Sequence, residues 1–176
     1  MSQIKKMTPD VINTTNISPN ELKNTLFKML AKDDKEAKMS ILVQSFGFKY
    51  GIPMDCDNVL DVRFIPNPYY IPELKAYCGL DCQVRDYVFS FPETNDFMTK
   101  ALDLFLQTIP FYIREGKVRL NIGIGCTGGR HRSVAIAEEL AKILTEKGFH
   151  VAIDHRDLEN DARTKENECE KNRIVE

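Results

Sequence analysis

The 176-residue sequence contains no tryptophan, and it has no apolar run near the roughly 18 residues that a membrane-spanning helix needs. Its polar start, Met-Ser-Gln-Ile-Lys-Lys, lacks the apolar core of a secretory signal peptide. Its five cysteines have no paired spacing and fit reduced thiols. We therefore expect a cytoplasmic protein with no membrane attachment.

Three further absences narrow the chemistry. No Gly-x-x-x-x-Gly-Lys-Ser/Thr sequence occurs, which argues against nucleoside triphosphate hydrolysis by this chain alone. The net charge of −2 argues against a general nucleic-acid surface, because Lys and Arg supply most non-specific affinity for phosphates. Cys78 and Cys82 have no second pair of ligands after them, so we expect neither a metal site nor a cofactor.

The spacing of apolar residues predicts one main domain over residues 39–159, preceded by a short segment and followed by a charged tail at 160–176. In residues 1–38, the run Ser18-Pro19-Asn20-Glu21 predicts a helix start, and its apolar positions continue to Leu30. A helix this short is marginal when isolated, so it must pack on something.

Within the main domain, strand patterns alternate with helical ones. We expect strands at 40–46, 58–64, 118–125 and 149–153, with helices near 72–77, 84–89, 92–115 and 130–147. The 92–115 helix is predicted from a capping box at Ser90 to Glu93, and Pro110 is expected to kink it. This alternation predicts an α/β fold with an open, mostly parallel sheet flanked by helices.

The stretch from 118 to 133 is the richest in functional signals. A strand ends at Cys126, the turn Thr127-Gly128-Gly129 follows, and a helix begins near Arg130. Amides at a helix start lack intrahelical partners, and the helix dipole adds partial positive charge, so such a turn suits an anion. Side chains of the Arg130-His131-Arg132 run add donors, and phosphate or a phosphorylated small molecule is the expected ligand.

Polar loops follow all four predicted strands, at residues 47–51, 61–70, 126–132 and 155–156. In open parallel sheets ligands bind at the carboxyl ends of the strands, so we expect these loops to meet at one edge. Two prolines fix the shape of the 61–70 loop and hold the side chain of Asn67 in place. Glycine turns also occur in α/β proteins with nothing bound, and His131 has an alternative interpretation as a solvent-facing residue of the first helical turn.

A second chemistry fits the same turn. The spacing Cys126-x5-Arg132-Ser133 equals that of the phosphate loop in cysteine-dependent phosphatases, in which a helix start lowers the pKa of the thiol. Gly125 stands where those enzymes usually have His, and Asp61 and Asp157 are the candidates for a general acid. Phosphatase catalysis by Cys126 and Arg132 is therefore the alternative function. A third interpretation makes Cys126 only a small residue that fits a strand end, in an oligomerisation module with a vestigial pocket.

Four runs together resemble the C-terminal domain of the RapZ/YvcJ family. They are residues 45–53 (SFGFKYGIP), 61–68 (DVRFIPNP), 124–133 (IGCTGGRHRS) and 155–159 (HRDLE). Residues 10–30 also resemble the last strand and helix of that family's N-terminal kinase-like domain, whose P-loop is missing here. The resemblance implies either that residues 1–38 are a remnant of that domain plus a linker, or that the chain is cut from a longer protein.

The resemblance further implies a regulator more than an enzyme. In this family the C-terminal domain is similar to a three-layer subdomain of phosphofructokinase and forms oligomers, so a homo-oligomer is expected. Enterobacterial members bind glucosamine-6-phosphate and present a small regulatory RNA to a ribonuclease. The implied roles of this chain are therefore a sugar-phosphate sensor that signals to an RNA or a protein partner.

Carried over to this sequence, the sugar-phosphate site combines the glycine turn with the loop after the second strand. Asp61 would hold a sugar amine or hydroxyl, while the turn and Arg132 would take the phosphate. The full set of candidate ligand-binding residues is Asp61, Arg63, Asn67, Cys126, Thr127, Gly128, Gly129, His131 and Arg132.

The sequence departs from the enterobacterial pattern at two places. Tyr69 stands where those members have His, at a position that bears on amino-sugar specificity. Residues 154–176 contain five Lys or Arg and eight Asp or Glu, a net of −3, whereas the enterobacterial tail is basic and contacts RNA. An anionic tail repels RNA phosphates.

Overall fold

The computed structural model describes residues 39–160, together with residues 12, 14, 15, 17, 18, 22 and 25. The chain divides into two units, residues 1–37 and 38–176, and the fold below is that of the second unit. Apart from those single positions, the helix predicted before residue 30, the linker and the charged tail beyond residue 160 lie outside the described residues.

The core of the domain is a four-stranded sheet. Its strands are β1 (Ser40–Gly47), β2 (Asn58–Asp61), β3 (Arg119–Cys126) and β4 (His150–His155). They lie in the order β2-β3-β1-β4, and every neighbouring pair is parallel. The predicted α/β class and open parallel sheet are thus confirmed. The second strand is shorter than predicted, because the chain turns after Asp61.

Within residues 39–160, three α-helices accompany the sheet, α2 (Cys82–Phe89), α3 (Pro92–Arg114) and α4 (Arg132–Glu146). Two short 3-10 helices, η2 (Phe48–Tyr50) and η3 (Pro68–Tyr70), lie in the loops after β1 and β2. The helix predicted at 72–77 is wrong, because these residues form turns. The capping box at Ser90 is also wrong, since Ser90 Oγ donates back to the carbonyl of Tyr87 and leaves α3 to begin at Pro92.

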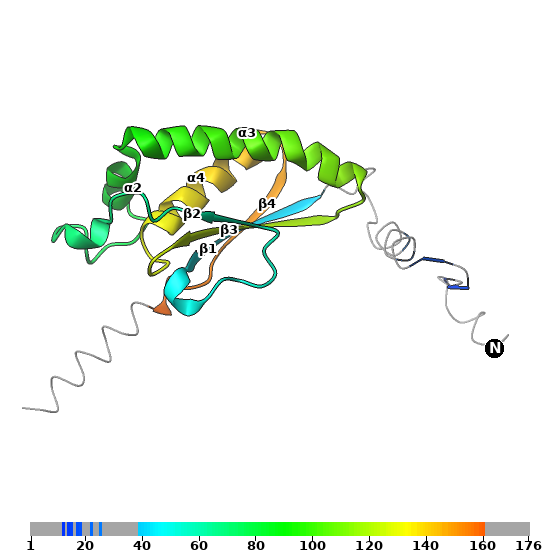
Figure 1. The fold of residues 1–176 in the computed structure, drawn as a ribbon, viewed down its shortest axis with the longest axis horizontal. Helices are drawn as coiled ribbons and strands as arrows, with labels where there is room; N and C mark the ends of the chain where they lie inside the picture. The colour runs from blue at the N-terminus through cyan, green and yellow to red at the C-terminus, as the bar shows by residue number, and fades with distance from the viewer. Residues whose placement is uncertain are drawn as a thin grey trace, which may run out of the picture. The chain divides into compact units, whose positions relative to one another are not determined.

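The helices α3 and α4 lie on the same side of the sheet, with α4 against the strands and α3 outside it (Figure 1). The connections from β2 to β3 and from β3 to β4 step across the sheet in the same direction, and right-handed crossovers then place their helices on one face. Side chains that alternate along β1 and β3 fill the space beneath α4. Fully buried members of this core include Ile41, Val43, Leu120, Ile122 and Ile124.

On the opposite face of β3, two aromatic rings pack directly against Gly125. A Cβ atom added to Gly125 would lie 2.5 Å from ring atoms of both Phe46 and Phe48. These two rings pack edge to face, with centroids 4.9 Å apart. The side chain that cysteine-dependent phosphatases carry before their cysteine therefore has no room at position 125.

We expect Gly125→Ala to lower the free energy of unfolding by about 1–3 kcal/mol, because the added methyl group overpacks the ring pair. Urea unfolding followed by circular dichroism measures the change. The double variant Gly125→Ala/Phe48→Leu replaces one ring with a smaller side chain and should recover part of the lost free energy of unfolding. An unfolding midpoint equal to that of the parent protein would show that the rings move aside freely.

Candidate functional site

The loops that follow the four parallel strands meet at one edge of the sheet. The amide of Lys49 donates to the carbonyl of Thr127 (3.2 Å), and the amide of Val62 donates to that of Gly125 (2.9 Å). The amide of Gly47 donates to Oδ2 of Asp157 at 2.8 Å. Three loops that are distant in sequence are therefore fixed around the 127–131 turn.

The turn itself lies at the surface. Thr127 is exposed and Gly128 is half-buried, and within residues 39–160 the amides of Gly128 and Arg130 donate no hydrogen bond. Gly129 has φ of +76°, which suits a residue without a side chain, and it packs against the backbone of Gly47. These two amides lie just before His131, the N-cap of α4, and have no hydrogen-bond partner within residues 39–160.

The side chain of Arg132 lies beneath this turn and is only 4% exposed. Its NH1 donates to the carbonyls of Arg63 (3.0 Å) and Ile65 (2.7 Å), and its NH2 donates to Thr127 Oγ1 (3.1 Å). Its Nε is buried and has no partner among the described residues. Arg132 therefore joins the β2 loop to the turn and keeps one donor unused.

Burial lowers the pKa of the Arg132 guanidinium, while nearby Cys126 and Asp61 act in the opposite direction. Arginine nevertheless stays protonated in proteins. Among residues 39–160 no carboxylate forms an ion pair with Arg132, so its direct hydrogen bonds go to neutral carbonyls and a hydroxyl, and the Asp61 carboxylate acts only at longer range. Such a charge favours an anion beside it.

Arg130 does not supply the second guanidinium that the sequence predicted for this turn. Its side chain donates to the carbonyls of Ala76 (3.0 Å), Tyr77 (3.3 Å) and Leu158 (3.5 Å). In return the amide of Gly79 donates to the carbonyl of Arg130 at 2.9 Å. Arg130 ties two loops together, a role that sequence spacing does not distinguish from ligand binding.

Asp61 and Arg63 form a paired group at the rim of the site. Nε and NH2 of Arg63 both donate to the Asp61 carboxylate, at 2.6–3.0 Å, and the amide of Arg63 donates to it as well. Both side chains are about half exposed. The Arg63 guanidinium also lies over the ring of Phe48, 4.1 Å from its centroid. The hydrogen bonds from Arg63 are the largest cause that lowers the pKa of Asp61.

The remaining candidates divide into buried and capping residues. His131 is 6% exposed and precedes the first residue of α4, where its carbonyl accepts from the amide of Ala135. Asn67 accepts from the amide of Tyr69 at 3.4 Å and so caps η3. Ligand contacts by His131 and Asn67 stay predictions.

Cys126 is buried directly below the turn. Its Sγ lies 3.1 Å from Ser133 Oγ and accepts from the amide of Gly129 at 3.2 Å. The sequence identified the spacing of Cys126, Arg132 and Ser133, and the structure brings the three residues together as that spacing requires.

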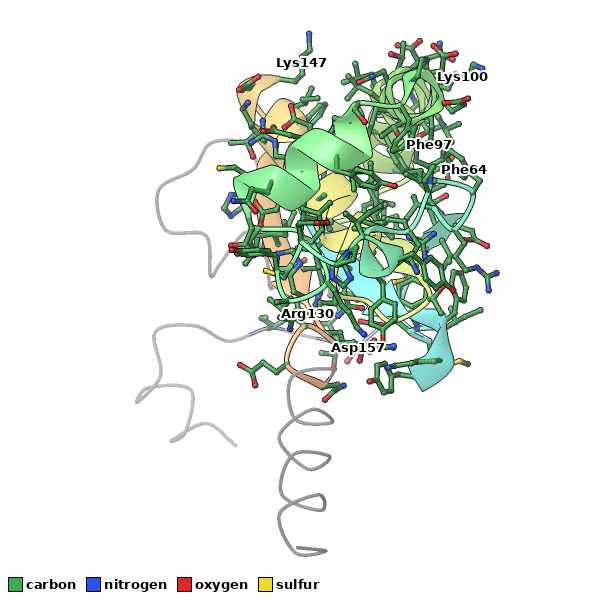
Figure 2. All side chains as sticks on the ribbon, turned by 90° about the vertical axis from the view of Figure 1, so that its left-hand side faces the viewer. Phe64, Phe97, Lys100, Arg130, Lys147 and Asp157 are labelled. Atoms are coloured by element: carbon green, nitrogen blue, oxygen red, sulfur yellow. The ribbon has the colours of Figure 1, made fainter. Side chains whose placement is uncertain are left out.

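Asp157 has a structural role that the sequence did not reveal. Asp157 is buried, with 2% of the residue exposed, and its carboxylate accepts from the amide of Gly47, the guanidinium of Arg156 and Nδ2 of Asn160. Asp157 and Arg130 lie near the same end of the described domain (Figure 2), and NH1 of Arg130 donates to the carbonyl of Leu158, the residue after Asp157. The only signal in the sequence was an acidic residue at the carboxyl end of a strand, which does not separate a proton donor from a structural acceptor.

His155 also has defined partners. Its Nδ1 lies 2.8 Å from Ser45 Oγ, and its Nε2 lies 3.0 Å from Glu138 Oε1. It thereby connects β1, β4 and α4. Within the described part of the chain, no three His, Cys, Asp or Glu side chains group as metal ligands, and no helix is both long and apolar enough to cross a membrane.

Comparison with known families matches residues 39–159 to the family described as RapZ C-terminal domain. The chain belongs to this family. The RapZ C-terminal domain thus covers all four strands, the glycine turn, Asp61, Arg63 and Asp157.

Similar curated proteins carry the name nucleotide-binding protein. One from Acetivibrio thermocellus is 52% identical over 164 residues, which are 93% of this chain and 56% of that protein. Another from Caldicellulosiruptor saccharolyticus is 47% identical over 163 residues, again 93% and 56%. The chain therefore spans a little over half the length of these relatives, and its RapZ domain lies within the shared part.

We expect Arg63→Ala to raise the pKa of Asp61 from below its ordinary range towards about 3.9. A carboxyl whose pKa is depressed in the folded state contributes stability above the unfolded-state pKa, and this contribution is lost as the pH falls through the folded-state value. As the pH falls below about 4, the free energy of unfolding should therefore decrease less in the variant than in the parent protein. Carbon-13 NMR titration of the carboxyl groups measures the shift.

Asp81 is an internal control for this titration. Hydrogen bonds from the Cys78 amide and side chain lower the pKa of Asp81, and Arg63 is not among the causes. Its titration should be the same in both proteins. An unchanged Asp61 pKa in Arg63→Ala would contradict the role assigned to Arg63.

Proposed function

We propose that this RapZ C-terminal domain is a non-catalytic regulatory domain that binds a phosphorylated sugar of the glucosamine-6-phosphate kind at the turn between Cys126 and Arg132. The single observation that carries the proposal is the buried guanidinium of Arg132, which has no ion-pair partner among the described residues and donates to Thr127, the exposed residue of the turn. A phosphate group would bring a negative charge beside the Arg132 guanidinium, and its oxygens would accept hydrogen bonds from the amides of the turn.

Magnitudes favour the side chain over the helix dipole as the main source of affinity. An anion at a helix start gains about 0.3–1 kcal/mol from the dipole, or about 2 kcal/mol when partly buried. Hydrogen bonds to charged groups contribute about 1.5–3 kcal/mol each. The Nε donor of Arg132 and the amides of Gly128 and Arg130 would together position the phosphate.

Binding without turnover is supported by the state of the candidate acids. Arg63 lowers the pKa of Asp61, so this carboxyl is ionised at neutral pH and has no proton to give to a leaving group. Asp157 is buried and already accepts from Gly47, Arg156 and Asn160. Neither carboxyl is arranged as a general acid.

The proposed signal to a partner starts from the contacts of Arg132. The same guanidinium donates to the carbonyls of Arg63 and Ile65 in the loop after β2. A phosphate that attracts the guanidinium would shift it and so alter these two hydrogen bonds. That loop carries Phe64, which is 53% exposed. A protein or RNA partner that contacts this loop would then sense whether the site is occupied.

We expect Arg132→Lys to weaken binding of glucosamine-6-phosphate roughly 10- to 100-fold, because lysine keeps the charge but loses the Nε donor and the planar geometry. Isothermal titration calorimetry measures the affinity. Arg130→Lys is the matched control, since that guanidinium donates to carbonyls of two loops. The control should lower the thermal unfolding midpoint and leave the affinity within about twofold.

Thr127→Val tests the same contact without altering a charge, because it removes the hydroxyl that holds NH2 of Arg132. It should weaken binding less than Arg132→Lys does. Binding that is equal in all variants, or absent from the parent protein with sugar phosphates and inorganic phosphate alike, would refute the proposed function.

Asp61→Asn tests whether the ligand carries an amine. An ionised carboxylate attracts a protonated amine more strongly than an amide does. The variant should therefore lose affinity for glucosamine-6-phosphate and keep its affinity for glucose-6-phosphate, with both measured by calorimetry. Equal losses for the two sugars would show that Asp61 does not select the amine.

Cysteine-dependent phosphatase activity is the second candidate, and one observation favours it. The sulfur of Cys126 accepts from the Gly129 amide and lies beside Ser133 Oγ, contacts that would stabilise a thiolate. Hydrolysis of an aryl phosphate by the parent protein that disappears in Cys126→Ser would establish this activity and overturn the non-catalytic proposal.

A further inference from the structure

A second pocket, whose lining includes no residue of the glycine turn, lies between three helices. The helices α2, α3 and α4 pack against one another in pairs (Figure 2), and a pocket of about 350 Å³ opens between them. Its apolar lining consists of Phe89, Met98, Leu102 and Ile143. Met98 is buried, and the other three side chains are half-buried. The volume of this helix pocket is within the range of small-molecule binding sites.

Each of the three helices presents one face to the helix pocket. The lining includes three pairs of residues that are four apart: Arg85 and Phe89 in α2, Met98 and Leu102 in α3, and Glu139 and Ile143 in α4. Residues four apart lie on the same face of an α-helix. Three helix faces therefore converge on the pocket, and each contributes at least one apolar side chain.

Charged side chains of both signs surround the opening of the helix pocket. Oε2 of Glu139 lies 3.4 Å from NH2 of Arg85, and its Oε1 lies 3.9 Å from Nζ of Lys142. Both distances exceed the roughly 2.7–2.9 Å of a charge-assisted hydrogen bond. Within residues 39–160 the carboxylate of Asp86 forms no ion pair or hydrogen bond, and the guanidinium of Arg85 forms no hydrogen bond. Arg85 and Asp86 can therefore both bind a ligand.

We propose that the helix pocket binds a free α-amino acid with an apolar side chain. The ligand carboxylate pairs with Arg85, the ligand amine pairs with Asp86, and the ligand side chain covers the apolar lining. The charges around the opening are balanced, because two cations, Arg85 and Lys142, accompany two carboxylates, Asp86 and Glu139. A lone anion or a lone cation is repelled there by groups of its own sign, whereas a zwitterion has a partner for each of its charges.

The binding should be weak. The side chain of Arg85 is 50% exposed, so water competes for its donors, and a ligand as small as an amino acid makes few contacts. We therefore expect a dissociation constant of roughly 0.1–10 mM. This proposal does not depend on ligand binding at the Cys126–Arg132 turn, and its test contains no phosphate.

The experiment is an NMR titration of the full 176-residue chain with L-leucine, followed through the backbone amide signals. The shifts should saturate and be largest in α2, α3 and α4 around the pocket. Three analogues each lack one feature of leucine: 3-methylbutylamine has no carboxylate, 4-methylpentanoate has no amine, and glycine has no apolar side chain. Each analogue should have a dissociation constant at least about tenfold higher than that of leucine.

Two charge-removing variants locate the site. Arg85→Gln should raise the dissociation constant for leucine at least about tenfold, because it removes the partner of the ligand carboxylate. Lys142→Gln is the matched control, since Lys142 is similarly exposed (56%) and also lies beside Glu139 but does not line the pocket. It should change the constant less than about twofold.

Circular dichroism verifies that both variants are folded. The proposal would be overturned by the absence of saturable shifts with leucine, by an analogue that binds as tightly as leucine, or by equal effects of Arg85→Gln and Lys142→Gln.

Discussion

The site depends on one buried positive charge. Arg132 has 4% of its surface exposed, and its guanidinium is held by carbonyls of the β2 loop and by the hydroxyl of Thr127. Taking a charge out of water is costly unless it is neutralised, and dipoles of neutral groups do this incompletely. An anion beside the turn would therefore stabilise the charge of Arg132. The phosphate-binding and the thiol-chemistry interpretations of this loop both depend on that effect.

Close backbone contacts set the position of that charge. The 127–129 turn packs against Gly47 at the end of β1, and Gly125 accepts two aromatic rings on the other face of β3. Asp157, two residues after β4, accepts a hydrogen bond from the amide of Gly47 and so fixes this segment to the end of β1. Because interiors are packed as densely as organic crystals, such contacts leave little freedom for the turn to shift. Arg132 and the amides above it are consequently held in fixed relative positions, as a preorganised binding site requires.

The sequence predicted the strands, the long helices and the convergence of loops, because apolar periodicity and parallel topology decide these features. It also identified Cys126, Arg132 and Ser133 from their spacing, since a strand-turn-helix unit fixes which side chains lie beneath the turn. It did not separate the roles of Arg130 and Arg132. Both are arginines at a helix start. Their roles depend on which backbone carbonyls lie within reach, residues 76 and 77 for Arg130 and residues 63 and 65 for Arg132. Asp157 is a similar case, because its partner Gly47 lies in a distant segment of the chain. Ser90 bonds to the carbonyl of Tyr87, in a turn that residue propensities do not specify.

The carboxylate of Asp157 has a mechanical consequence. It bonds simultaneously to the end of β1, to its neighbour Arg156 and to Asn160, and its Cβ lies against Gly129. The carboxylate therefore connects Asn160, the last residue of the described domain, to the end of β1 and to the backbone of the 127–129 turn. A substitution that removes the Asp157 carboxylate would consequently disturb three separate segments of the domain at once.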